Sequence, residues 1–250
     1  MNVGNFESLI ALCATYETRY NPVTTNLSIK NLLEIEIKAN KMLAVVNVAR
    51  TKFNHHCDVR RIHFTAYKKL AKQAINELLI SGASDLTIRA VKEIEKKFNG
   101  IKERSVKMIE IPPGNIEITT SLSKKIMVGK LSFISQIDNF KNLLEFLKQQ
   151  NNYKPNDFIL QTQQLGTTLS KLKKIHYKVI RCESTLDSVK IIRNDHFYAP
   201  ETGMVTIAIN VKKYIKETFG SSSSQYRQIN QLKFVNIRIH ENEIIINNIL

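Results

Sequence analysis

The fold is decided by residues 32–53, which read LLEIEIKANKMLAVVNVARTKF. Apolar residues recur there every seven positions, in two interleaved sets. These sets are Leu32, Ala39, Val46 and Phe53, and Ile35, Met42 and Ala49. A seven-residue apolar repeat of this length is typical of a long helix that packs at a shallow angle against its neighbours. The pattern predicts a spine helix over about residues 27–62.

The same pattern returns about 133 residues later, where residues 165–186 read LGTTLSKLKKIHYKVIRCESTL. Its apolar sets are Leu165, Leu172, Val179 and Leu186, and Ile175, Cys182 and, three residues beyond this stretch, Val189. Tyr20-Asn21-Pro22 returns as Tyr153-Lys154-Pro155, and His63-Phe64 returns as His196-Phe197. With a one-residue slip, Ala74-Ile75-Asn76 aligns with Ala208-Ile209-Asn210. The repeat predicts a second spine helix over about residues 158–194 and a duplicated, domain-sized unit.

Each sequence unit is predicted to hold four helices and to end in a small β-hairpin. Besides the spines, we expect helices around residues 6–13 and 140–147, at about 66–81 and 202–218, and at about 84–98 and 223–234. The hairpins are expected at residues 106–120 and 235–250. The predicted fold is therefore mainly α, with tandem duplicated four-helix bundles built on long heptad-patterned helices. The expected boundaries are 1–100 for the first helical unit, 101–130 for a linker, 131–234 for the second unit and 235–250 for the terminal hairpin.

The chain is strongly basic, with 37 Lys+Arg against 22 Asp+Glu and a net charge of +15. Such an excess of positive charge favours binding to a polyanionic partner such as nucleic acid. The candidate contact residues are Arg60, Arg61, Lys68, Lys69, Lys72, Lys171, Lys173, Lys174, Lys178 and Arg181. The two basic stretches occupy different places in the two repeats, whereas a binding site inherited through duplication would sit at equivalent positions. Lysines on solvated helix faces are therefore the preferred interpretation.

No catalytic, cofactor-binding or metal-binding residue is predicted, and we expect a protein that is not an enzyme. The sequence has no phosphate-binding loop and no Gly-x-Ser-x-Gly or His-Glu-x-x-His motif. The cluster His55-His56-Cys57-Asp58 could be read as part of a metal site, but consecutive histidines do not share a helix face. The preferred reading is structural, with Arg60 and His63 at the end of the spine, as Arg193 and His196 are in the second unit.

Tyrosines at the helix ends have two interpretations. Tyr20, Tyr153, Tyr198 and Tyr214 could form a stacking platform for bases. Local packing of the ring, with a hydrogen bond from its hydroxyl, is the preferred alternative.

Composition places the chain among ordinary globular proteins, with 43% hydrophobic residues and no apolar run long enough for a membrane span. Three cysteines do not make a disulfide framework, and the first residues do not follow the pattern of a secretory signal. We expect a cytoplasmic protein without a membrane partner.

The second unit carries a distinctive string, from Asn194-Asp195-His196-Phe197-Tyr198-Ala199-Pro200-Glu201-Thr202-Gly203 through Phe219-Gly220 to Leu232-Lys233-Phe234. With Tyr153-Lys154-Pro155 upstream, it resembles a group of uncharacterised, internally duplicated helical proteins of Bacteroidota. The resemblance covers about residues 130–237 well and the first unit loosely. It implies a duplicated helical fold and brings no catalytic residue.

Two functional hypotheses follow. The preferred one is a non-enzymatic structural or protein-interaction scaffold, which could self-associate through the hairpin at 235–250. The alternative is a basic protein associated with RNA, the ribosome or DNA.

Overall fold

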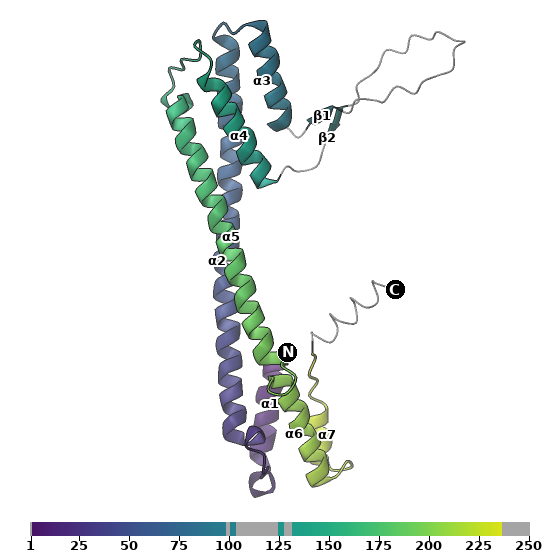
Figure 1. The fold of residues 1–250 in the computed structure, drawn as a ribbon. Coiled ribbons are helices and arrows are strands. Elements are labelled where there is room, and N and C mark those ends of the chain that lie inside the picture. The colour runs from purple at the N-terminus through teal and green to yellow at the C-terminus, as the bar shows by residue number, and fades with distance from the viewer. Residues whose placement is uncertain (1, 99–100, 104–124, 128–131, 237–250) are drawn as a thin grey trace, which may run out of the picture. The chain divides into compact units, whose positions relative to one another are not determined.

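The computed structural model describes residues 2–98, 101–103, 125–127 and 132–236, and these form a mainly α-helical fold (Figure 1). The helices are α1 (Asn2–Thr15), α2 (Ile29–Ile80), α3 (Asp85–Phe98), α4 (Phe133–Lys148), α5 (Thr162–Tyr198), α6 (Met204–Phe219) and α7 (Ser224–Asn230). Short 3₁₀ turns lie at Glu17–Arg19, Thr25–Leu27 and Phe158–Leu160. Among these described ranges, no helix combines the length and the apolar character that a membrane crossing requires.

The helices pack into two compact units, and each unit draws on both halves of the sequence. Unit 1 comprises Met1–Asn54 and Arg181–Leu250, and unit 2 comprises His55–Ile180. Unit 1 is therefore built from the two ends of the chain, and unit 2 is built from its continuous middle part. The boundaries expected near residues 100 and 131 separate the repeats in the sequence, but they do not separate the packed bodies.

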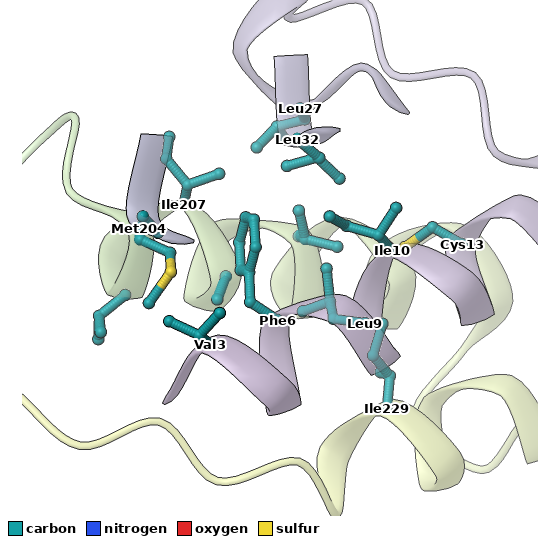
Figure 2. Close-up of a cluster of buried hydrophobic side chains, with 14 of the residues drawn as sticks. Val3, Phe6, Leu9, Ile10, Cys13, Leu27, Leu32, Met204, Ile207 and Ile229 are labelled. Carbon is teal, nitrogen blue, oxygen red and sulfur yellow. The ribbon is translucent and has the colours of Figure 1, made fainter. Parts of the chain in front are cut away.

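The core of unit 1 forms where α1 packs against α6 and the start of α2. Figure 2 shows Phe6, Leu9 and Ile10 of α1 directed toward Leu32 of α2 and Ile207 of α6. Phe6, Leu9 and Leu32 are fully buried. Removal of such apolar surface from water is the main stabilising term of a helical bundle.

The core of unit 2 is built in the same way from different helices. Phe140 and Leu143 of α4 pack with Leu165 of α5 and with the C-terminal half of α2. All three side chains are fully buried, as are their counterparts in unit 1. A local hydrogen bond is also shared, because Tyr20 Oη donates to the Leu27 carbonyl at 2.6 Å and Tyr153 Oη to the Leu160 carbonyl at 2.7 Å.

Most of the seven-residue positions of the spine are buried. The buried members are Leu32, Ala39, Val46, Ala49, Leu165, Leu172, Val179 and Leu186. Phe53 and Cys182 are half-buried, so the prediction that they lie fully in the core is wrong. Phe53 packs at the edge of a small cluster of Val46, Ala49 and Leu186.

The first spine helix does not end near residue 62 as expected, because α2 continues without a break to Ile80. The second spine does end, at Tyr198, and α6 starts at Met204. The sequence supplies the reason, since Pro200 lacks an amide donor and disfavours helix in the residue before it. The first repeat has Tyr67 at the position of Pro200, and it is buried within the helix.

In the third helical segment, the burial of side chains agrees with an offset of 133 residues and does not agree with the expected one-residue slip. Ala74 and Ile75 are buried in unit 2. At an offset of 133 they correspond to Ile207 and Ala208, which are buried, whereas Ile209 is 42% exposed. Positions 133 apart are called paired positions below.

Two short strands, β1 (Ile101–Glu103) and β2 (Lys125–Met127), pair antiparallel. The hairpin expected at 106–120 lies outside the described residues. So does the hairpin expected at 235–250, apart from Val235 and Asn236, which have no regular secondary structure. Both hairpins therefore stay predictions.

Candidate functional site

Each compact unit contains a pocket of ligand-binding size. The pocket in unit 1, called here the Lys38 pocket, has a volume of about 460 Å³ and lies between α2 and the junction of α5 with α6. The pocket in unit 2, the Lys171 pocket, has a volume of about 480 Å³ and lies between α2 and α5. Both volumes fall within the range of small-molecule sites, which is about 300–1,000 Å³.

The two pockets are lined by paired positions. Three pairs share a chemical function: Lys38 with Lys171, His196 with His63, and the carboxamides Asn31 with Gln164. The other pairs are Asn26 with Ile159, Ile35 with Thr168, Ala39 with Leu172, Ala199 with Ala66, and Thr202 with Lys69. A lysine, a histidine and a carboxamide therefore recur at the same places in two separate bodies.

The pockets differ in charge. The Lys171 pocket contains Lys69 in addition to Lys171 and has no Asp or Glu among its lining residues. In the Lys38 pocket Thr202 takes the place of Lys69, and the carboxylate of Asp195 is present. The Asn31 amide there already donates to the Asn26 carbonyl at 2.8 Å. The Lys171 pocket is thus the more cationic of the two.

The basic residues predicted from the sequence gather in unit 2. Both stretches, Arg60–Lys72 on α2 and Lys171–Lys178 on α5, belong to this unit, and Arg181 alone belongs to unit 1. The structure brings the stretches together in the Lys171 pocket, where Lys69 and Lys171 both lie, while Lys68, Lys69 and Lys72 line a neighbouring hollow of about 350 Å³. Residues 55–180 hold 22 Lys+Arg against 11 Asp+Glu, and so carry +11 of the total charge of +15.

Exposure separates these basic residues into two kinds. Arg61 and the lysines of both stretches are exposed, whereas Arg60 is half-buried. The Arg60 guanidinium lies 4.0 Å from the centre of the Phe133 ring, and its Nη1 donates to His176 Nδ1 at 3.3 Å. Arg60 is therefore engaged inside unit 2, and its assignment as a surface contact for phosphate is not supported by its environment.

The Arg60–His176 contact has an electrostatic consequence for the histidine. Burial lowers the pKa of His176 below its ordinary value of 6.5, and the nearby Arg60 charge lowers it further. Arg60 Nε and His176 Nε2 are buried and have no hydrogen-bond partner among the described residues. The neutral imidazole is the form that accepts the bond from Arg60.

The polar cluster at residues 55–58 forms ordinary helix-surface contacts. Asp58 accepts a hydrogen bond from Arg61 at 2.9 Å, and Cys57 Sγ is 3.9 Å from an Arg60 nitrogen. In the part of the chain that the structure describes, no group of three His, Cys, Asp or Glu could hold a metal ion. The expected role of Arg60 and His63 at a helix end is wrong, because α2 continues to Ile80.

The helix-end tyrosines pack locally. Tyr20 and Tyr153 are buried and bonded through their hydroxyls, Tyr20 meets Tyr214 edge-to-face at 5.4 Å, and Tyr198 is buried. Burial raises the pKa of Tyr153 to about 12. These environments agree with the packing interpretation of the four tyrosines.

Sequence reasoning missed the paired Lys38 and Lys171, although the offset that relates them was visible. It noted His63 and His196 as repeated residues without placing them in a pocket. Comparison of the chain with family models, curated protein sequences and solved structures finds no match. The assignment of function therefore rests on the chain's own geometry.

Proposed function

We propose that the protein is a non-enzymatic, internally duplicated helical scaffold whose unit 2 binds nucleic acid through its phosphate backbone. The observation that carries the proposal is the concentration of charge in one compact body. In the sequence, the two basic stretches occupy different places in the repeats. This difference argues against a binding site that both repeats share. That objection does not apply within unit 2, because residues 55–180 form one compact unit that contains both stretches.

The physical basis is counterion release. Each phosphate neutralised by Lys or Arg frees condensed cations, so affinity depends steeply on salt. The exposed lysines of α2 and α5 in unit 2 carry positive charge without ion pairing among the described residues. The resemblance to duplicated helical proteins supports the scaffold part of the proposal and names no ligand.

The test replaces four exposed lysines of unit 2, namely Lys68, Lys72, Lys173 and Lys174, with glutamine. A matched control replaces four exposed lysines of unit 1, namely Lys30, Lys41, Lys52 and Lys213. Binding of a mixed-sequence single-stranded RNA is followed by fluorescence anisotropy over a range of salt concentrations. The unit 2 variant should bind more weakly, and its log–log salt slope should flatten by about 0.7 for each lost phosphate contact. Equal effects of the two variants, or no salt-sensitive binding by the wild type, would contradict the proposal.

A second candidate, protein interaction, is favoured by an apolar row on α2 in unit 1. Leu33, Ile37, Val45 and Val48 are each 43–55% exposed and lie on one side of the helix. A row of this kind could dock a protein partner or a second copy. Val48→Lys should then lower the mass of any complex in analytical ultracentrifugation. Deletion of residues 235–250 tests the separate proposal of self-association through the terminal hairpin. If neither variant changes the mass of the complex, neither of these two surfaces binds a protein partner.

A further inference from the structure

We propose that the Lys171 pocket of unit 2 binds a phosphate group, held by Lys171, His63 and Lys69, and that the Lys38 pocket is a weaker copy of this site. The inference deepens the proposed function, because it assigns a particular phosphate site within unit 2.

The first argument is the recurrence of polar residues at paired positions. Core residues recur in the repeats because packing requires them. Lys38, Lys171 and His196 are exposed, and His63 is half-buried, so packing does not fix their identity. Their recurrence around pockets of nearly equal volume is explained if both pockets bind the same chemical class of ligand.

The second argument is the chemistry of the lining. Two ammonium groups and an imidazole supply N–H donors, and Gln164, Gln73 and Thr168 supply further donors. With no carboxylate among the lining residues, the pocket favours an anion, and charge-assisted hydrogen bonds to a phosphate are stronger than bonds to a neutral ligand. The walls include the apolar Ile159, Leu70 and Leu172, which can cover the uncharged part of a phosphorylated molecule.

The third argument is the difference between the copies. In the Lys38 pocket the second lysine is absent, and Asp195 adds negative charge. The same ligand should therefore bind there more weakly. The proposal thus predicts that the Lys171 pocket binds the ligand more tightly than the Lys38 pocket. A general excess of surface charge would not produce this difference at these particular residues.

The experiment measures binding of adenosine monophosphate and of inorganic phosphate to the full chain by isothermal titration calorimetry. Lys171→Gln and His63→Gln should each weaken the affinity for adenosine monophosphate by about tenfold, as expected for loss of one hydrogen bond to a charged group. Lys38→Gln should have a smaller effect. Lys52→Gln is the matched control, since Lys52 is exposed on α2 and lines neither pocket. Circular dichroism confirms that each variant is folded.

A competition experiment then identifies the source of the phosphate. If the pocket holds a nucleic-acid phosphate, saturating adenosine monophosphate will weaken RNA binding, and Lys171→Gln will weaken both ligands. If it holds a free phosphorylated molecule, RNA affinity will not change when adenosine monophosphate is added. Both results support the phosphate site. The proposal is overturned if adenosine monophosphate shows no saturable binding, or if Lys171→Gln and His63→Gln bind it as tightly as Lys52→Gln. RNA binding that persists after this failure would leave the proposed function of unit 2 standing.

Discussion

Units 1 and 2 have the same plan but different surfaces. Unit 1 combines α1 and the start of α2 with the end of α5, α6 and α7, and unit 2 combines α4 and the start of α5 with the end of α2 and α3. Their cores use equivalent apolar positions, whereas unit 2 carries +11 of the charge and unit 1 keeps an exposed apolar row. The comparison teaches that similar apolar cores can underlie surfaces of different charge, because packing constrains the buried positions more than the exposed ones.

The largest effects are expected in the two cores. Phe6→Ala in unit 1 and Phe140→Ala in unit 2 should each lower the free energy of unfolding by about 3–5 kcal/mol, since both rings are fully buried. Phe53→Ala should cost less, because Phe53 is half-buried at the edge of a cluster. Chemical denaturation measures all three. A large difference between Phe6→Ala and Phe140→Ala would break the equivalence of the cores.

A smaller effect is expected where the two repeats differ in backbone path. A Cβ on Gly203 would lie 2.5 Å from the Ala199 backbone nitrogen, so Gly203→Ala should destabilise the protein by about 1–3 kcal/mol. Gly4 of α1 has open space around it, and Gly4→Ala should stabilise by up to about 1 kcal/mol through helix propensity. Thermal unfolding compares the two variants. Similar melting temperatures would show that the α5–α6 junction tolerates a side chain.

The smallest effect concerns pH and is specific to unit 2. The pKa of His176 is lowered in the folded protein, so the unfolded chain binds the proton more readily. The stability that depends on neutral His176 is present above pH 6.5 and is lost as the pH falls through the lowered folded pKa. The paired position in unit 1 is Leu43, which suggests His176→Leu as the variant.

His176→Leu should make the unfolding free energy less sensitive to acid below pH 6.5. His55→Gln, at an exposed position, is the control variant. Unfolding by urea at a series of pH values provides the measurement. An identical acid response in His176→Leu would show that the Arg60–His176 contact does not set it.

Much of the helical plan could be predicted from the sequence, and the limits have physical causes. The seven-residue pattern located both spine helices, and Pro200 lies just beyond the observed end of the second. The continuation of α2 through His63 and Phe64 was missed because the break was assumed to recur, although no proline or glycine enforces it there. The pocket residues were missed because the seven-residue periodicity shows only which face of a helix is buried. It does not show which part of the chain supplies the helix that packs against that face.

The central claim is that each compact unit is built from both halves of the chain. Fragment complementation tests this claim most directly. Residues 1–98 and 132–236, produced as separate chains, each lack half of both compact units. We predict that neither fragment is a compact monomer, and that mixing them gives a one-to-one complex with cooperative unfolding. Sedimentation equilibrium with circular dichroism measures both properties. Two fragments that each fold alone as a stable monomer and do not associate would contradict the account.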